Sequence, residues 1–320
     1  MNSTPTPENQ SAQWEQDLIK RFAFEALQEQ RRARRWSIFF KLLLMMYLLG
    51  ALLIGAGLGK GFGKGELGGP SSITAAVDVK GVIAPDMPAS AANVIEGLRA
   101  AFEDKRTAAV LLRINSPGGS PVQSGLINDE IFRLKHKYPS IKVYAAVEDI
   151  CASGAYYVAS AADEIYADKG SLVGSIGVRM DGFGFVDALS KLGVERRLLT
   201  AGEHKAFLDP FSPVKPDEKK FVEGLLGEIH QQFINTVKKG RQERLKSEVD
   251  LFNGLIWTGE RGLELGLVDA LGSADFVARE IVRAEELVDF TPHENALAQL
   301  GRRFGAQIGA SIRQSLATQW

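Results

Sequence analysis

Two kinds of hydrophobic pattern alternate along most of this chain. Short apolar runs, typical of buried strands, are followed by longer stretches in which apolar residues recur every three or four positions, as in helices. The predicted strands cover 73–79, 108–114, 141–147, 164–167, 171–178 and 196–200, and the predicted helices cover 89–102, 122–135, 154–162 and 185–192. Repeated strand-then-helix units predict an α/β fold, a mainly parallel sheet with packed helices.

Two later segments carry apolar stripes at helical spacing. After Pro216, every fourth residue is apolar, at Phe221, Leu225, Ile229, Phe233 and Val237, which predicts a long helix packed against the sheet domain. The second stripe comprises Leu297, Leu300, Phe304, Ile308, Ile312 and Leu316. It predicts an amphipathic C-terminal helix over 289–320, which packs on its own domain or a neighbouring subunit, or alternatively lies on a membrane surface.

The N-terminal part has a different composition. Residues 38–58 are almost all apolar, about the length that crosses a bilayer of roughly 30 Å, and four arginines lie shortly before this run. The positive-inside rule then keeps the N-terminus in the cytoplasm, whereas a cleaved secretory signal is the alternative. The predicted organisation is a cytoplasmic segment over 1–37, a transmembrane helix over 38–58, a glycine-rich linker over 59–72, a folded domain over 73–288 and the C-terminal helix over 289–320.

Composition excludes several classes of function. The chain has 320 residues, 45% of them hydrophobic and 24% charged, and a net charge of −1, so no overall charge attracts it to nucleic acid. Its single cysteine, Cys151, cannot form an intramolecular disulfide, and its four histidines show no metal-ligand spacing.

Ser153 and Lys205 are the candidate catalytic residues. Ser153 follows the predicted strand over 141–147 and opens a helix, and Lys205 lies in the loop that follows the predicted strand over 196–200. A serine hydroxyl must lose its proton as it attacks, and a lysine can accept that proton only when it is neutral, a state that burial favours. The apolar residues that follow Lys205 suit such burial, so the pair predicts a Ser-Lys hydrolase.

Backbone amides near Ser153 are the candidate oxyanion donors. The amide of Gly154 lies at the start of the helix that Ser153 opens. A second donor is expected from the turn over 116–119, where Gly118 and Gly119 allow the backbone to approach a substrate closely.

Five segments resemble the signature of the signal peptide peptidase A family, the S49 serine peptidases of bacterial membranes. They cover 113–124, 147–157, 173–178, 202–211 and 257–269. The resemblance implies a ClpP/crotonase-type fold, the nucleophile at Ser153, the general base at Lys205 and a lysine-orienting hydroxyl at Ser175. The chain is similar to the short, single-repeat members, which assemble into a ring or dome with each active site at a subunit junction.

The same resemblance implies a location and a substrate class. The protein would be a single-pass protein of the bacterial inner membrane with its catalytic domain on the periplasmic side. Its substrates would be remnant signal peptides or other membrane-associated polypeptide segments, and no metal or nucleotide cofactor is implied.

Alternatives remain for the residues and for the function. His204, next to Lys205, could be the base instead, although adjacent residues on an extended chain point to opposite sides. Cys151 could be a thiol nucleophile, but a small buried hydrophobe is the better interpretation. A crotonase-like acyl-CoA enzyme and an inactive membrane scaffold on the same fold are the alternative functions.

Overall fold

The structure is a computed structural model that describes residues 34–51, 72–246 and 250–292. The chain forms two compact units, over 1–69 and 70–320, and each is considered by itself. The predicted cytoplasmic segment over 1–37, linker over 59–72 and C-terminal helix over 289–320 fall almost entirely outside the described residues.

The first unit contains one described helix, over 34–51. Residues 52–58 of the predicted transmembrane segment lie outside the described part. Among the described residues, no helix combines the length and the apolar character that crossing a bilayer requires. The transmembrane helix therefore stays a prediction.

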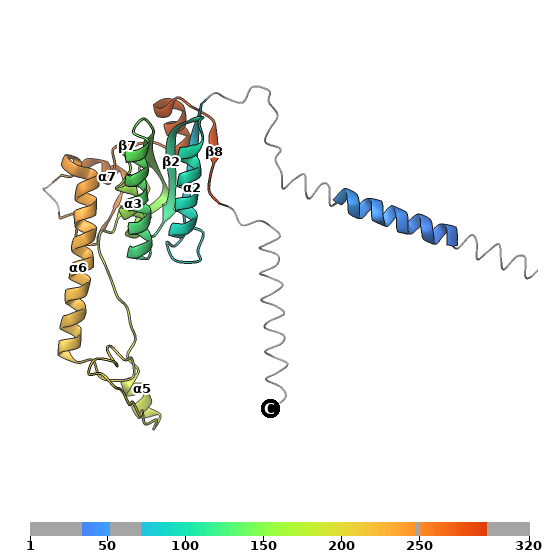
Figure 1. The fold of residues 1–320 in the computed structure, drawn as a ribbon. Coiled ribbons are helices and arrows are strands. Elements are labelled where there is room, and N and C mark those ends of the chain that lie inside the picture. Colours follow the sequence, from blue (N-terminus) through green and yellow to red (C-terminus); the bar gives the residue numbers. More distant parts are fainter. Residues whose placement is uncertain (1–33, 52–71, 247–249, 293–320) are drawn as a thin grey trace, which may run out of the picture. The chain divides into compact units, whose positions relative to one another are not determined.

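The second unit is built on an eight-stranded sheet (Figure 1). Its strands are β1 (Ile73–Lys80), β2 (Thr107–Ser116), β3 (Lys142–Ala152), β4 (Glu164–Ala167), β5 (Leu172–Gly174), β6 (Ile256–Thr258), β7 (Ala270–Leu271) and β8 (Leu287–Asp289). The main path runs β6-β5-β3-β2-β1-β8, with β4 paired to β3 and β7 to β4, and every pairing is parallel except β5 with β6. The predicted α/β fold with a mainly parallel sheet is confirmed.

Helices cover both faces of this sheet. The described helices of this unit are α2 (Ala91–Glu103), α3 (Pro121–Lys137), α4 (Gly154–Ala159), α5 (Val186–Lys191), α6 (Pro216–Arg241), α7 (Gly259–Leu265) and α8 (Ala274–Phe276), with a 3₁₀ turn over Gln242–Arg244 and a π-helical turn over Val277–Val282. The main core lies under α2, α3 and α4, and a smaller cluster around Leu111, Tyr166 and Val277 lies on the opposite face.

Local chemistry sets where α2 and α3 begin and how they pack together. Ser90 and Ser120 are their N-caps, each accepting a hydrogen bond from the backbone three residues later. Glu130 of α3 is 9% exposed and accepts hydrogen bonds from Arg133 at 2.7 Å and Arg99 of α2 at 2.7 Å. These contacts lower the pKa of Glu130 to about 2, and the hydrogen bond from Arg133 has the largest effect.

The long helix α6 departs from its prediction. Phe233 and Val237 are buried, but Phe221 is 66% exposed and Leu225 is 40% exposed, so only the C-terminal half packs on the sheet domain. The expectation that the whole stripe packs there was wrong, because the N-terminal half extends beyond the edge of the core. Figure 1 shows α6 reaching away from the sheet toward α5.

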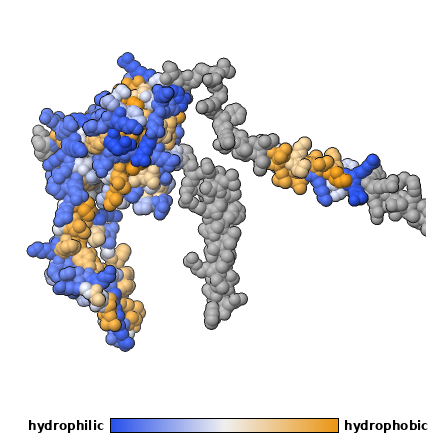
Figure 2. Space-filling model, viewed as in Figure 1, coloured by the Kyte–Doolittle hydropathy of each residue, from blue (hydrophilic) through white to orange (hydrophobic). Residues whose placement is uncertain are grey.

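We call residues 178–215, which connect the sheet domain to the start of α6, the arm. The predicted strand over 196–200 lies here and does not form, because no strand of the sheet runs beside it. Its Arg196 instead bonds Asp209 at 2.6 Å and stacks over the ring of Phe211. Large hydrophobic side chains are exposed along the arm: Met180, Phe183, Phe185, Leu192, Val194, Leu198, Leu199, Phe211 and Val214. Figure 2 shows hydrophobic residues gathered on this part of the molecule.

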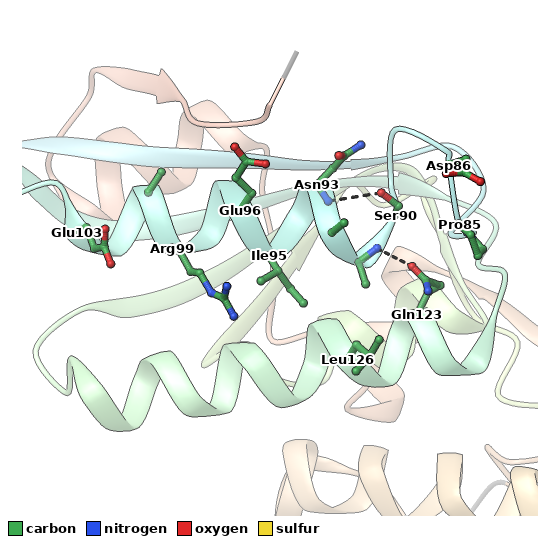
Figure 3. A pocket seen from close by; sticks show the side chains of 13 residues that line it. Pro85, Asp86, Ser90, Asn93, Ile95, Glu96, Arg99, Glu103, Gln123 and Leu126 are labelled. Carbon is green, nitrogen blue, oxygen red and sulfur yellow. Dashed lines mark hydrogen bonds between the residues drawn. The ribbon is translucent and has the colours of Figure 1, made fainter. Parts of the chain in front are cut away.

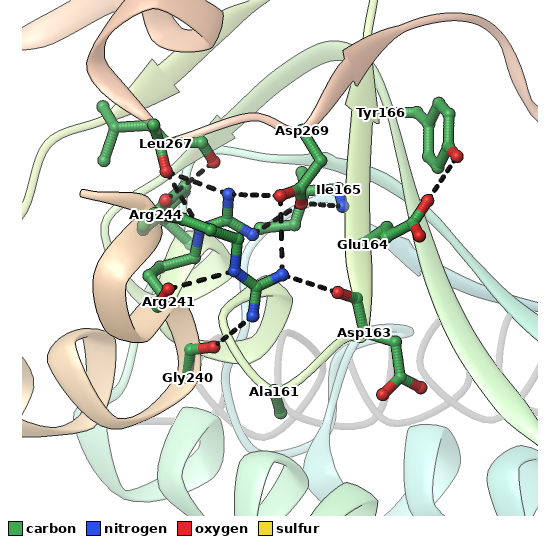
Figure 4. A network of polar contacts seen from close by, with 12 residues as sticks. Ala161, Asp163, Glu164, Ile165, Tyr166, Gly240, Arg241, Arg244, Leu267 and Asp269 are labelled. Atoms are coloured by element: carbon green, nitrogen blue, oxygen red, sulfur yellow. Dashed lines mark hydrogen bonds and ion pairs between the residues drawn. The ribbon is translucent and has the colours of Figure 1, made fainter. Parts of the chain in front are cut away.

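A buried arginine fixes the other end of α6 to the core (Figure 4). The Arg241 side chain is fully buried, and its guanidinium donates to both carboxylate oxygens of Asp269, at 2.6 and 2.9 Å, and to the carbonyl of Gly266. Asp269 also accepts from the amide of Ile165 in β4 at 2.7 Å. Because α6 is anchored in this way, its middle turns keep a defined place beside the site described next.

Candidate active site

Ser153 lies at a sharp turn between two elements. β3 ends at Ala152, α4 begins at Gly154, and Ser153 between them has φ 54° and ψ −124°, a conformation that costs a non-glycine residue about 1–3 kcal/mol. Two backbone hydrogen bonds hold it there: its amide donates to the carbonyl of Gly174 at 2.8 Å, and its carbonyl accepts from Tyr157 at 3.0 Å. These bonds fix the half-buried Ser153 at the junction between β3 and α4.

The predicted oxyanion turn lies directly against Ser153. Gly118 has φ +96°, and a Cβ atom at this position would lie 2.8 Å from the Ser153 Cβ, so the approach requires glycine. The amide of Gly118 already donates to the Ser116 hydroxyl at 3.1 Å. By contrast, the amides of Gly119 and Gly154 donate to no acceptor in the described part of the chain. Of the three predicted glycines, these two therefore have amides free to bind a ligand.

Ser175 lies beside Ser153 because their strands are paired. In the parallel β3–β5 ladder, Ala152 is opposite Gly174, so the two serines occupy equivalent positions just beyond the strand ends. Ser175 also has a positive φ, 52°, and its amide donates to the carbonyl of Leu255 at 2.7 Å. The structure thus brings Ser153, Ser175 and the glycine turn together.

A cavity of about 380 Å³ opens beside Ser153. Its wall is formed by Gly119, Pro121, Val122, Gly125, Ser153, Gly154, Tyr157, Val178, Ile229, Gln232 and Phe233, with no charged side chain among them. The rings of Tyr157 and Phe233 pack 5.1 Å apart, joining α4 to α6. This cavity can accept an apolar side chain next to the serine hydroxyl.

Lys205 is not part of this cluster within one chain. It is exposed in the arm, in a turn that touches the first turns of α6: the Leu208 amide donates to Glu218 at 3.4 Å, and the Phe207 and Phe221 rings pack 5.6 Å apart. Ile229, the first residue of α6 that lines the serine cavity, is eight residues beyond Phe221, about 12 Å by the helical rise. Lys205 does not line this cavity, and a lysine side chain of about 6 Å is shorter than this separation along α6.

The two rival residues have clear positions. His204 is exposed on the same turn as Lys205 and, like Lys205, does not line the Ser153 cavity. Cys151 is completely buried in the main core, and this burial raises the pKa of its thiol. The interpretation of Cys151 as a small buried hydrophobe is confirmed.

Sequence reasoning did not identify the residues that shape the cavity. Tyr157 carries no signal as a lining residue, and the α6 stripe predicted Ile229 and Phe233 only as core residues. His230, between them, contacts the carbonyl of Ile176 through Nε2 at 3.1 Å, which ties the segment carrying Ser175 to α6. A lone histidine in a helix gives no indication of this contact.

A larger groove, of about 1020 Å³, lies between α2 and α3 (Figure 3). Arg99, Glu96 and Glu103 lie along it, and Gln123 of α3 accepts from the amide of Ala91 at 2.8 Å at one end. Ser153 does not line this groove, which holds no nucleophile with a neighbouring base. The site chemistry therefore belongs to the smaller cavity.

A family model and two relatives of this chain indicate a family of peptidases. The model of peptidase family S49 matches residues 135–288. A Methanocaldococcus jannaschii protein with a provisional protease name is 33% identical over 230 residues, covering 70% of this chain and 72% of its own. An Enterococcus faecium protein provisionally named signal peptide peptidase SppA is 32% identical, covering 62% of this chain and 57% of its own.

A further match has a different name. A Brucella melitensis protein named Na(+)/H(+) antiporter NhaA is 50% identical over 184 residues, which make up 58% of this chain. This chain spans only 24% of the length of that protein. The archaeal relative, by contrast, is matched over most of its length, and with the family model it confirms the family that the sequence motifs predicted: this chain belongs to peptidase family S49.

Proposed function

We propose that this protein is a serine endopeptidase that cleaves peptide bonds through an acyl-enzyme on Ser153, with Lys205 as general base. The observation that carries the proposal is the strained turn at Ser153, which faces the free amides of Gly119 and Gly154 beside an apolar cavity. A serine hydroxyl between two unpartnered amides and a side-chain pocket is the arrangement that acyl transfer requires.

The chemistry follows from these groups. Ser153 Oγ attacks the scissile carbonyl carbon while its proton passes to the neutral Lys205 amine, and the amides of Gly119 and Gly154 bind the oxyanion. Lys205 then donates the proton to the leaving amine as the C–N bond breaks. A water molecule, deprotonated by the same lysine, hydrolyses the ester and frees Ser153. Ser175 would accept a hydrogen bond from the lysine and fix its orientation.

We infer that a second copy of the chain supplies the lysine. Within one chain the Lys205 turn contacts α6 at Glu218 and Phe221, and Phe221 lies about 12 Å along the helix from Ile229 of the Ser153 cavity. The arm exposes many large hydrophobic side chains, as does the start of α3, where Val122 is 68% exposed and Leu126 is 49% exposed. Docking the arm of one copy over the α3 surface of the next would bury both surfaces and complete the dyad. A ring or dome repeats this junction around a closed assembly.

The substrates would be remnant signal peptides or other membrane-associated segments, bound with an apolar side chain in the cavity. An uncharged cavity supports this class because a charged side chain would lose its hydration there without gaining a partner. The proposal includes the ClpP/crotonase-type fold, an anchor over 38–58 in a bacterial inner membrane and a periplasmic catalytic domain. The sequence supports the anchor through its apolar run and preceding arginines.

The test measures cleavage of a fluorogenic apolar peptide by the full-length protein and by Ser153→Ala, Lys205→Ala and His204→Ala. We expect the first two variants to be inactive and to sediment like the wild type, and His204→Ala to retain activity. An active Lys205→Ala with an inactive His204→Ala would assign the base to the histidine. A wild-type protein that cleaves no peptide in a broad panel would favour the acyl-CoA or scaffold alternatives.

A further inference from the structure

Glu218 is a buried carboxylate next to the turn that carries Lys205. Its side chain is only 6% exposed, although it lies in the first turn of a helix whose N-terminal half is otherwise largely exposed. One carboxylate oxygen accepts from the Leu208 amide at 3.4 Å, and the other lies 3.4 Å from the amine of Lys215, which is 63% exposed. Burying a charged group is unfavourable unless it is hydrogen-bonded, so the burial of Glu218 requires an explanation.

The helix N-terminus explains the negative charge but not the burial. Asp217 and Glu218 are both in the first turn of α6, where a carboxylate interacts favourably with the helix dipole. Asp217 has this position and remains exposed. Glu218 differs because its side chain lies under the arm and contacts the backbone there. Its particular contribution is therefore to the arm rather than to the helix.

The segment that Glu218 contacts is a tight turn in an unfavourable conformation. Successive backbone bonds close it, from Lys205 to Gly202, from Phe207 to His204 and from Asp209 to Ala206, and Leu208 has φ +51°. A non-glycine residue keeps such a φ only where its surroundings hold it. The hydrogen bond from the Leu208 amide to Glu218 and the packing of Phe207 on Phe221 both join this turn to α6.

We propose that Glu218 is a positioning residue for Lys205. It holds the turn that carries Lys205 on α6, so that the lysine has a fixed position relative to the sheet domain. This inference rests on the proposed function, because it assigns Glu218 a role in delivering the base of that reaction. α6 itself is fixed at its far end by the Arg241 network. The helix then acts as a rigid spacer with the Lys205 turn bound to its first turns.

Three variants of the full-length protein test this role. Glu218→Ala removes the acceptor for the Leu208 amide, and Glu218→Gln keeps an acceptor oxygen while removing the charge. Asp217→Ala is the matched control, since it removes one carboxylate from the same helix turn without touching the arm. The variants are compared by kcat and KM on a small fluorogenic peptide, with the oligomer checked by sedimentation velocity.

We expect Glu218→Ala to lower kcat about 10- to 100-fold, because a misplaced base slows the chemical step. KM should change less than about threefold, and Glu218→Gln and Asp217→Ala should keep kcat within about threefold of wild type. A kcat for Glu218→Ala equal to that of Asp217→Ala would overturn the positioning role. The proposed function would still hold in that case, provided that the wild type cleaves the peptide.

A second measurement does not depend on activity. In a Ser153→Ala background, trypsin cleavage after Lys205 reports how often the turn opens, and mass spectrometry identifies the fragment. Cleavage should be about tenfold faster in Glu218→Ala than in Asp217→Ala, because the turn has lost its contact with α6. Equal rates would overturn the positioning role even if the variant assembled poorly. A wild type without peptidase activity would overturn the proposed function and, with it, the catalytic purpose of the turn.

Discussion

If Ser153 and Lys205 act from different copies, two inactive variants should restore activity to each other. Ser153→Ala and Lys205→Ala would be co-expressed at equal levels with different affinity tags, and mixed assemblies purified through both tags in turn. Each variant alone should be inactive. In a mixed assembly, a junction is active where an intact serine of one copy meets an intact lysine of its neighbour.

The expected recovery follows from counting junctions. With equal, random incorporation, half of the copies carry the intact serine and half carry the intact lysine, so about a quarter of the junctions are complete in a ring of many copies. Selection through both tags raises this fraction in small assemblies, to about half in a dimer. The structural basis is the separation along α6 between Phe221, which packs on the Lys205 turn, and Ile229, which lines the cavity. It is about 12 Å, and a lysine side chain spans only about 6 Å.

A second mixture gives an independent check. Wild type mixed equally with the double variant Ser153→Ala/Lys205→Ala should keep about a quarter of its activity if the dyad joins two copies, but about half if each chain completes its own site. The assay is cleavage of a fluorogenic apolar peptide per mole of chain. No recovery in the first mixture together with half activity in the second would refute the reasoning and would show that the arm folds back onto its own Ser153.

Three further predictions concern stability and specificity. Glu130 should contribute about 1–3 kcal/mol to the free energy of unfolding above about pH 4.5, and this contribution should be lost as the pH falls toward 2, because its pKa is lowered only in the folded state. In chemical denaturation, Glu130→Gln should reduce the loss of stability over this range by that amount, while the other carboxylates with lowered pKa values, such as Asp104 and Asp289, keep their own contributions. Gly125→Leu should fill the cavity. It should lower kcat/KM about tenfold more for peptides with leucine or phenylalanine at the cleaved bond than for peptides with alanine there, whereas Asp129→Leu on the same helix should leave both kcat/KM values unchanged. Arg241→Leu should destabilise the protein by about 3–5 kcal/mol in thermal or chemical unfolding, because it leaves Asp269 with only the longer contact to Arg244, at 3.4 Å. The double variant Arg241→Leu/Asp269→Leu should be less destabilised than the single variant.

Local patterns predicted the longer strands of the sheet well, although the run over 171–178 forms β5 only over Leu172–Gly174, and the short strands β6, β7 and β8 were not predicted. The predicted strand over 164–167 coincides with β4, and the runs at 73–79 and 108–114 lie within β1 and β2, because a strand buried on both faces must be continuously apolar. The strand predicted over 196–200 does not form, because an apolar run marks a strand only where the fold buries it. Its apolar residues are not buried within the chain at all, since Leu199 is 96% exposed.

The site was predictable in parts. The turn at Ser153 and its glycine neighbours depend on local sequence, and the strand pairing that brings Ser175 beside them follows from the parallel sheet. The position of Lys205 depends instead on how far α6 extends beyond the core, which an unbroken i+4 stripe does not reveal. Nor could the sequence show that Gly118 has a bonded amide while those of Gly119 and Gly154 are free, because this depends on the Ser116 side chain.

Because Lys205 is exposed in a single chain, assembly would also change the surroundings of its amine. A lysine accepts a proton from serine only in its neutral form, and burial among apolar groups favours that form. In a single chain Lys205 is exposed, so the activating burial would have to come from the neighbouring copy. The apolar side chains near the Ser153 cavity, including Val122 and Phe233, are suited to provide it. On this argument an isolated subunit lacks both a lysine next to Ser153 and apolar surroundings for that lysine, and peptidase activity should rise with protein concentration over the range in which the assembly forms.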